Sequence, residues 1–351
     1  MVDEINPVKT AIIGLGRSGW GIHINRMRTH PGFRVSAVTD PLPERMKEAE
    51  SEFHCATFGD YRELLKKADA ELVVVATPSH THVAYAVDAL KSGRNVLVEK
   101  PVADKHADGL RILSAARKAG KHLFIHQNNR FIPEIQHLKS FMDGGLIGRV
   151  FEIKARSQRF AIRNDWQTLK KYGGGLLPNN GTHLVDQILY LLGSPVKDIW
   201  CDLKLVSDVG DVEDHVKILL RAENGVVADV EISTSCAIAE PAWTLLGNCG
   251  TLVCDGESST IKFFDPARMP KLEAQESLAS EGRRYTHHAL TWDDRTITVE
   301  GEFVWDFYEN VYEVMRKGGQ MRVTPESALE TLRVLEIAAK GGVQDVRVGK
   351  K

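Results

Sequence analysis

The chain has 351 residues, of which 43% are hydrophobic and 26% are charged, as in an ordinary globular protein with two domains. Its formal net charge of −2 argues against a nucleic-acid-binding patch or an acidic tail. The N-terminus lacks the apolar segment of a signal peptide, and no stretch of about 18 apolar residues predicts a transmembrane helix. The five scattered cysteines have no metal-site spacing, so we expect no metal and reduced thiols in a cytoplasmic protein.

The first part of the chain alternates between strand and helix patterns. The predicted strands begin at residue 9, entering a glycine turn, and then cover 34–40, 56–58, 72–76, 96–98 and 122–126. The predicted helices cover 19–28, 42–53, 61–67, 82–92 and 104–119. The run from Leu72 to Ala76 is unbroken and rich in β-branched residues, which is typical of a central parallel strand. This alternation predicts an α/β protein whose residues 1–127 form an N-terminal Rossmann domain with a doubly wound parallel sheet.

Beyond residue 127 the pattern changes. Helices are predicted at 133–143, 182–192, 303–317 and 325–339, with polar or irregular stretches at 160–175 and 265–290. Strands are predicted at 149–159, 196–206, 214–221, 225–236, 241–247, 251–264 and 296–300. So many strands with so few helices between them predict a C-terminal α+β domain, residues 128–351, built on one large, mostly antiparallel sheet.

Gly14-Leu-Gly16-Arg17-Ser18-Gly19 fits the spacing of a dinucleotide-binding turn. It follows a predicted strand and opens a predicted helix, which is the context that this motif requires. The first glycine permits the tight turn, the second lets the backbone approach a pyrophosphate, and the third lets helix and strand pack closely. Free N–H groups at the start of the helix favour the phosphates. The alternative is a glycine-rich turn that binds nothing.

Asp40 ends the second predicted strand, 21 residues after Gly19. A carboxylate at this place accepts hydrogen bonds from the adenosine ribose and repels a 2′-phosphate. The nearest following cation is Arg45, so the sequence favours NAD over NADP. Asp40 could instead cap the next helix or stabilise the turn before Pro41, and these roles are compatible with ribose binding.

The segment Thr77-Pro78-Ser79-His80-Thr81-His82 follows the fourth predicted strand. It lies at the same carboxyl edge of the sheet, where its hydroxyls and backbone could line the nicotinamide ribose. The alternative is a capping turn, in which Ser79 or Thr81 caps the next helix.

Lys100 follows the short apolar run Val96-Leu97-Val98 and precedes Pro101. Proline stops strand pairing and keeps the preceding residue extended, so Lys100 should lie at the carboxyl end of a buried strand. Ligands bind at that edge of an open α/β sheet, and lysine offers three donors with a tunable pKa. Taken alone, Lys100 is equally consistent with an exposed lysine at the start of a loop.

Motifs in the same order over nearly the whole chain resemble those of one family. They are Gly14-Leu-Gly-Arg-Ser-Gly19, Ala76-Thr-Pro-Ser79 with His82, Glu99-Lys100-Pro101, Arg130, Gly173-Gly-Gly175, Gly181-Thr-His183-Leu-Val-Asp186 and Phe307-Tyr-Glu-Asn310. On this basis the chain is identified as a member of the Gfo/Idh/MocA oxidoreductases. The resemblance implies a Rossmann domain, a second domain on a large antiparallel sheet, and a nicotinamide-dependent reaction on sugars or polyols.

The resemblance also implies roles for individual residues. The cofactor set is Gly14, Gly16, Arg17, Ser18, Gly19, Asp40, Thr77, Pro78, Ser79, His82, Glu99 and Lys100. The catalytic set is Lys100, His183 and Asn179, and the substrate set is Asn128, Arg130, Arg163, Trp166, Tyr172, Asn179, His183 and Asp186. Arg159 and Asp165 are further candidates for substrate contact. Any one of the loop residues could equally be a solvated side chain, and Asp186 could form a structural hydrogen bond.

A neutral imidazole suits the removal of a proton from a secondary alcohol, and we assign this role to His183. Lys100 would donate a hydrogen bond to the reacting oxygen, and its charge would disfavour an imidazolium at His183. The chain departs from relatives of inositol dehydrogenase at Asn179, where they carry aspartate four residues before the histidine. An amide can bond a hydroxyl but holds no ionisable proton.

The sequence therefore predicts an NAD-dependent oxidoreductase that acts on a hydroxyl or keto carbon of a sugar, inositol or related polyol. A second hypothesis is a sugar-modifying enzyme with tightly bound NAD, which oxidises its substrate transiently and shows no net redox change. A third hypothesis is a cofactor-sensing regulator without turnover, for which the loss of Lys100 or His183 would be expected. From the habit of the family and the open face of the second sheet, we expect a homodimer or homotetramer, with no nucleic-acid or membrane partner.

Overall fold

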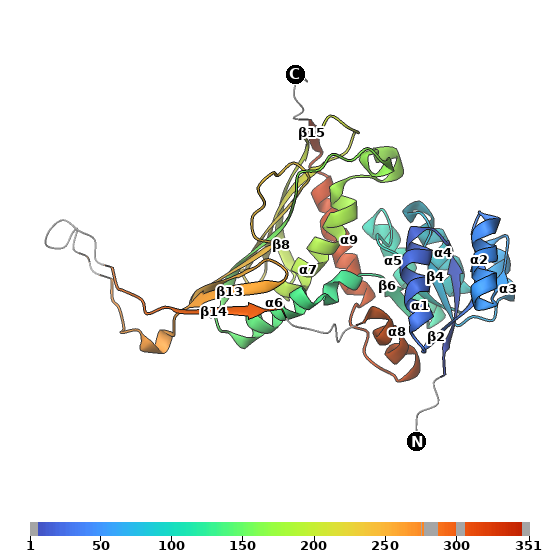
Figure 1. Ribbon diagram of the computed structural model, residues 1–351, viewed down its shortest axis with the longest axis horizontal. Coiled ribbons are helices and arrows are strands. Elements are labelled where there is room, and N and C mark those ends of the chain that lie inside the picture. Colours follow the sequence, from blue (N-terminus) through green and yellow to red (C-terminus); the bar gives the residue numbers. More distant parts are fainter. Residues whose placement is uncertain (1–5, 275, 277–286, 300–305, 346–351) are drawn as a thin grey trace.

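The computed structural model describes residues 6–274, 276, 287–299 and 306–345 (Figure 1). It has two parts, a smaller one built on a parallel sheet and a larger one built on a broad, mostly antiparallel sheet. Helices of the second part lie on the side of its sheet that faces the first part (Figure 1). Within the described residues, no helix combines the length and apolar character needed to span a membrane.

The smaller sheet has six parallel strands in the order β3-β2-β1-β4-β5-β6, which confirms the predicted doubly wound fold. The strands are β1 (Val8–Ile13), β2 (Phe33–Thr39), β3 (Ala56–Thr57), β4 (Leu72–Val75), β5 (Asn95–Val98) and β6 (Leu123–Ile125). The helical segments are η1 (Gly19–Ile24), α1 (Asn25–Thr29), α2 (Pro43–Phe53), α3 (Tyr61–Lys67), α4 (Ser79–Lys91) and α5 (His106–Ala119). All of β4 is fully buried, as its apolar run predicts. Because β2 and β4 flank β1 on opposite sides, the winding reverses there, and the carboxyl edge at such a reversal is where open α/β sheets bind ligands.

The larger sheet has nine strands in the order β14-β13-β12-β11-β7-β10-β9-β8-β15. The strands are β7 (Val150–Gln158), β8 (Val196–Leu205), β9 (His215–Ala222), β10 (Val227–Ser233), β11 (Trp243–Gly247), β12 (Gly250–Cys254), β13 (Ser258–Phe263), β14 (Asp293–Thr298) and β15 (Val343–Asp345). Two of its pairs, β7 with β10 and β8 with β15, are parallel, and the other pairs are antiparallel. The predicted mostly antiparallel sheet is confirmed.

Two details of this sheet differ from the prediction. The predicted strand 251–264 is two strands, because the chain turns at Asp255-Gly256. Gly256 adopts a φ of +101°, and Asp255 Oδ1 accepts hydrogen bonds from the backbone N–H groups of Glu257 and Ser258. The short edge strand β15 was not predicted, since three residues carry too little periodicity to be recognised.

Helices α6 (Pro133–Gly144) and α7 (Thr182–Leu192) belong to the larger part. Helix α8 (Phe307–Arg316) returns the chain to the smaller part, and α9 (Pro325–Ala339) leads it back to the larger one (Figure 1). Tyr308 and Val311 of α8 and Leu329 of α9 belong to the core of the parallel sheet. Val334 and Leu335, farther along α9, belong to the second core. The first core is therefore completed by residues that lie far beyond position 127. Residues 303–305 of the helix predicted at 303–317 lie outside the described residues.

The face of the larger sheet that the helices do not cover mixes apolar and charged side chains. Phe151, Trp200 and Leu219 are exposed, and the last two lie opposite each other on β8 and β9. Lys217 Nζ lies 2.7 Å from a carboxylate oxygen of Asp229 on the neighbouring strand. Such cross-strand pairs stabilise the sheet and leave a partly apolar surface on it.

Candidate active site

Lys100 lies directly after β5, at the carboxyl edge of the parallel sheet, as predicted. Its Nζ donates to the backbone carbonyl of Asn179, at 3.3 Å, and so reaches across to the second part of the molecule. Burial lowers the pKa of Lys100, the nearby carboxylate of Glu99 raises it, and Arg17 on the glycine turn lowers it. The structure thus joins a lysine, the glycine turn and the Asn179 segment in one place.

Asn179 and His183 lie one turn apart where the π-helical segment η5 (Leu177–Gly181) runs into α7. Side chains four residues apart share a helix face, so both residues face the same region. The side-chain amide of Asn179 donates to the carbonyl of Gly175, at 2.8 Å. An ionised aspartate has no proton to donate to this carbonyl. The local structure therefore gives a reason for an amide at position 179.

His183 is largely buried beside Lys100. Burial is the main cause that lowers the pKa of His183 to about 3, and the charge of Lys100 adds to it. The ring is thus neutral at ordinary pH, as the sequence analysis expected from the nearby lysine. Its Nδ1 is buried and has no hydrogen-bond partner among the described residues. Since buried polar atoms are nearly always paired, this atom is suited to a bound hydroxyl group.

The glycine turn has the close approaches that its motif demands. Gly14 adopts a φ of +94°, and a Cβ at this position would lie 2.7 Å from the carbonyl oxygen of Ala76. A Cβ at Gly19 would lie 1.9 Å from the carbonyl oxygen of Gly14, so only glycine fits there. The space beside Gly16 is open up to the guanidinium of Arg45, 3.9 Å away. These residues fit a dinucleotide whose pyrophosphate approaches the backbone at Gly16.

Asp40 directly follows β2 and is almost completely buried. One carboxylate oxygen accepts a hydrogen bond from the N–H of Leu15 in the glycine turn, at 2.7 Å, and the other accepts from the N–H of Leu42, at 2.9 Å. Arg45 approaches the same carboxylate to 3.4 Å. Asp40 therefore stabilises the turn before Pro41 and also lies beside the glycine turn. Arg45, five residues later in the sequence, reaches the carboxylate of Asp40.

The segment after β4 lies at the same edge. Helix α4 begins at Ser79, earlier than predicted, and Thr77 Oγ1 lies 2.6 Å from the hydroxyl of Thr81. His82, in contrast, is buried with its two ring nitrogens 2.8 Å from the carbonyl oxygens of Thr77 and Pro101. Its ring is occupied in joining the two loops that follow β4 and β5. The contacts of His82 thus support these two loops, and both of its ring nitrogens are used within the protein.

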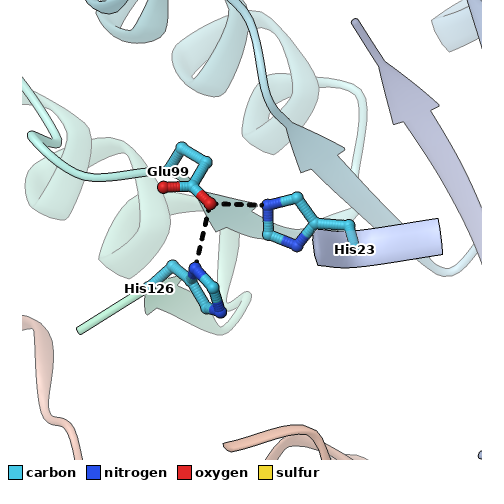
Figure 2. Close-up of side chains that lie close together, drawn as sticks. All are labelled: His23, Glu99 and His126. Atoms are coloured by element: carbon cyan, nitrogen blue, oxygen red, sulfur yellow. Dashed lines mark hydrogen bonds and ion pairs between the residues drawn. The ribbon is translucent and has the colours of Figure 1, made fainter. Parts of the chain in front are cut away.

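Glu99 was predicted in the cofactor set, but its side chain is turned into the core. Its carboxylate accepts hydrogen bonds from His126 Nδ1, at 2.9 Å, and from the backbone N–H of Lys100. It also lies 3.0 Å from His23 Nε2 (Figure 2). These contacts use the carboxylate within the protein. Neither histidine was singled out in the sequence, because they lie far apart along it.

Arg130 and Asp186, predicted to contact substrate, are bound to each other. Arg130 Nε and Nη2 donate to the two oxygens of Asp186, at 2.8 and 2.6 Å, and both side chains are buried. Thr331 of α9 donates to the same carboxylate, at 3.0 Å. The pair therefore connects three segments of the chain and leaves no free carboxylate for a substrate.

The remaining predicted substrate residues lie around the outside of the site. Asn128 is half-buried in the 3-10 turn η2 (Asn128–Phe131), just after β6. Trp166 and Tyr172 are exposed on two further 3-10 turns, η3 (Trp166–Thr168) and η4 (Lys170–Tyr172). Arg163 pairs with Asp165, at 2.5 Å, and this pair is also exposed. These contacts with substrate stay predictions.

A pocket adjoins the Asn179 segment, and Arg163, Asn180, Glu213 and Thr234 are among the residues that line it. Burial raises the pKa of Glu213, whose carboxylate accepts a hydrogen bond from the N–H of Leu177, at 2.9 Å. Glu213 and Thr234 were not predicted from the sequence. They come from the strand-rich region, where a polar side chain facing a pocket has no sequence signature of its own.

Comparisons with known proteins identify the family of the chain. A model of the oxidoreductase family with an NAD-binding Rossmann fold matches residues 8–127, and a model of the GFO/IDH/MocA C-terminal domain matches residues 135–253. An uncharacterized oxidoreductase of Schizosaccharomyces pombe is 24% identical, over 95% of this chain and 97% of its own. The scyllo-inositol 2-dehydrogenase (NADP(+)) of Bacillus subtilis is 22% identical, over 95% of this chain and 94% of its own. The crystal structure of an NAD-binding protein from Listeria innocua superposes with a TM-score of 0.78 at 26% identity, covering 96% of each chain. The chain belongs to the Gfo/Idh/MocA family of NAD-binding oxidoreductases.

Proposed function

We propose that this protein is an NAD-dependent dehydrogenase or reductase that acts on a secondary alcohol or keto carbon of a sugar, inositol or related polyol. The observation that carries the proposal is the meeting of Lys100, Asn179 and His183 beside the glycine turn. A proton donor and a neutral base there face the edge at which a nicotinamide would lie.

The chemistry divides between cofactor and protein. When bound, the nicotinamide supplies the hydride acceptor or donor. Lys100, protonated, donates a hydrogen bond to the reacting oxygen and stabilises negative charge on it. His183, neutral through burial, accepts the hydroxyl proton at Nδ1, the atom that is buried without a partner among the described residues. Asn179 holds the turn that carries Lys100's acceptor carbonyl.

The proposal of NAD rests on Asp40, whose carboxylate at the end of β2 would repel a 2′-phosphate. Arg45, 3.4 Å from that carboxylate, is the side chain that would favour NADP if Asp40 were absent. Because the Bacillus subtilis relative is named as an NADP(+) enzyme, the test below includes both coenzymes.

The test is a panel of sugars, inositols and polyols with NAD and NADP, followed by the absorbance of the reduced cofactor. We expect turnover with at least one member and its loss, by about a hundredfold to a thousandfold, in Lys100→Met, since charge stabilisation at a reacting oxygen contributes about 2.7–4 kcal/mol. The exposed Lys105, at the start of α5, provides the matched control Lys105→Met, which should retain activity. Full activity in Lys100→Met would exclude the mechanism. Tight NAD binding without net reduction of any substrate would favour transient oxidation instead.

We also propose that the chain forms a homo-oligomer through the open face of the larger sheet. This face exposes Trp200 and Leu219 side by side, and exposed apolar sheet surface is usually covered. Light scattering after size-exclusion chromatography should give a dimer or tetramer, and Trp200→Arg should shift it towards the monomer. A monodisperse wild-type monomer would contradict the proposal.

A further inference from the structure

A buried polar cluster contacts the backbone of Lys100, the proposed catalytic lysine. It consists of His23, Glu99, His126 and Tyr308, and we call it the Glu99 cluster. Figure 2 shows the two imidazole rings converging on one carboxylate oxygen, with His126 Nδ1 at 2.9 Å and His23 Nε2 at 3.0 Å from Glu99 Oε1. The hydroxyl of Tyr308 lies 2.5 Å from the other ring nitrogen of His23. All four residues are buried.

The cluster connects four segments that are remote in sequence. His23 lies on η1, in the helical segment that opens after the glycine turn, Glu99 follows β5, His126 follows β6, and Tyr308 lies on α8. Tyr308 therefore brings the late helix α8 against the nucleotide-binding end of the parallel sheet. None of the four residues is in the proposed substrate or hydride chemistry, yet each is connected to Lys100 through at most three contacts.

The protons of the cluster can be assigned from its contacts. Burial raises the pKa of Tyr308 well above its ordinary value, so its hydroxyl keeps a proton and can donate it to His23 Nδ1. Burial lowers the pKa of His23, so the ring is neutral and carries its proton on Nε2, towards Glu99. The Nε2 contact of 3.0 Å lies outside ideal hydrogen-bond geometry, so we count it as a close polar contact. Although burial opposes it, His126 and His23 hold the pKa of Glu99 well below its ordinary range.

Glu99 acts on Lys100 in two ways. Its second oxygen, Oε2, accepts a hydrogen bond from the backbone N–H of Lys100, at 2.9 Å, and so fixes the peptide from which the lysine extends. Its negative charge raises the pKa of Lys100, against burial and the charge of Arg17, which lower it. His183, which is also near Lys100, is neutral. Glu99 is thus the group that favours the protonated form of the lysine.

We propose that the Glu99 cluster is a positioning device for Lys100: it fixes the Glu99–Lys100 peptide and holds a buried negative charge next to the lysine. His23, His126 and Tyr308 are positioning residues that act through Glu99. The part that concerns catalysis rests on the function proposed for Lys100. The part that concerns the charge of Lys100 rests on the hydrogen bond that holds the Glu99 carboxylate at the Lys100 backbone and on the charge of that carboxylate, and it does not depend on the proposed function.

The same three donors, two imidazoles and a carboxylate, are also ligands that zinc accepts. We favour protons for two reasons. The nitrogen-to-carboxylate separations are hydrogen-bond lengths, and the hydrogen bond from Tyr308 to His23 Nδ1 leaves the proton of the ring on Nε2, the atom that faces Glu99. A bound metal is therefore an outcome that would overturn the proposal.

The test measures the pKa of Lys100 directly, by the pH dependence of its acetylation with acetic anhydride followed by mass spectrometry of the labelled peptide. Glu99→Gln keeps the shape and removes the charge, so we expect the pKa of Lys100 to fall by roughly one unit. Glu99→Asp keeps the charge and should keep this pKa near that of the wild type. An unchanged pKa in Glu99→Gln would overturn the proposal. Since labelling needs no substrate, this result is independent of whether any sugar is turned over.

Two further measurements complete the test. Tyr308→Phe should lower kcat at least fivefold while KM for NAD stays constant, whereas Tyr312→Phe, on the same helix but outside the cluster, should change neither. If Glu99→Gln does not fold, Tyr308→Phe decides the matter, and an unchanged kcat overturns the proposal.

Elemental analysis of the purified wild-type protein should show no stoichiometric metal. One metal per chain that is lost in His126→Asn would overturn the proton-held cluster.

Discussion

Asp186→Ala is the variant that best separates a structural from a substrate-binding role for the Arg130–Asp186 pair. In the structure both side chains are at most 6% exposed, and two parallel hydrogen bonds of 2.6 and 2.8 Å join them. Removing the carboxylate leaves the Arg130 guanidinium buried without its counter-charge and frees Thr331 Oγ1 of its acceptor. Breaking a buried pair in this way costs about 3–5 kcal/mol of folding free energy.

Urea unfolding followed by tryptophan fluorescence measures this cost, as a lower midpoint at an unchanged slope. The matched control is Asp198→Ala, which breaks an ion pair with Arg221 whose two side chains are more than half exposed. The control should change the free energy of unfolding by less than about 1 kcal/mol. If Asp186→Ala were as stable as the wild type but raised KM for a sugar, Asp186 would be a substrate contact and our reading of the pair would be refuted.

The remaining predictions concern the proposed site. Because the pKa of His183 is lowered to about 3, the folded protein keeps this ring neutral while the unfolded chain protonates it below about pH 6.5. The free energy of unfolding should therefore fall as pH drops from about 6.5 to 3, and it should fall less steeply in His183→Gln than in the wild type. If the free energy of unfolding had the same pH dependence in both proteins, this prediction would be wrong. In Asp40→Ser, the ratio of kcat/KM with NAD to kcat/KM with NADP should fall at least about tenfold, or ~1.4 kcal/mol. Steady-state assays with both coenzymes measure this ratio, and an unchanged ratio would show that Asp40 does not select the coenzyme. Asn179→Asp should lower the midpoint of thermal unfolding at any pH at which the new carboxyl is ionised, because its charged oxygen would face the carbonyl oxygen of Gly175. Calorimetry at pH 8 measures this midpoint. An unchanged value would show that the hydrogen bond from the Asn179 amide is dispensable.

Local patterns were sufficient for most of the fold. Helices α3, α7 and α9 match their predicted bounds, because each combines apolar periodicity with a clear start or stop signal. The parallel sheet followed from the βαβ alternation, and the glycine turn was recognisable because its spacing is a direct consequence of backbone contacts. The Asp255-Gly256 turn inside the predicted strand 251–264 was missed, because its neighbours on both sides favour extended structure.

The candidate site was predictable to a smaller extent. Lys100 and Asp40 were located because each ends a strand, and the ends of parallel strands share one edge. His82 and Glu99 were assigned to the cofactor because they belong to motifs at that edge, yet their side chains turn inward. The position in the sequence predicts that the backbone of such a residue lies at this edge of the sheet. Packing decides whether its side chain points towards a ligand or into the core.

By itself, the sequence determined the class of the protein: a parallel nucleotide-binding sheet, a second mostly antiparallel sheet, and a lysine and a histidine suited to acid–base chemistry. Only the tertiary structure decided which polar side chains face a ligand and which face each other. Arg130 and Asp186 satisfy one another, and Glu99 is held by two histidines from distant segments. The reason is physical. A buried charge must find its partner in space, and the segments that supply this partner are brought together only when both cores have formed.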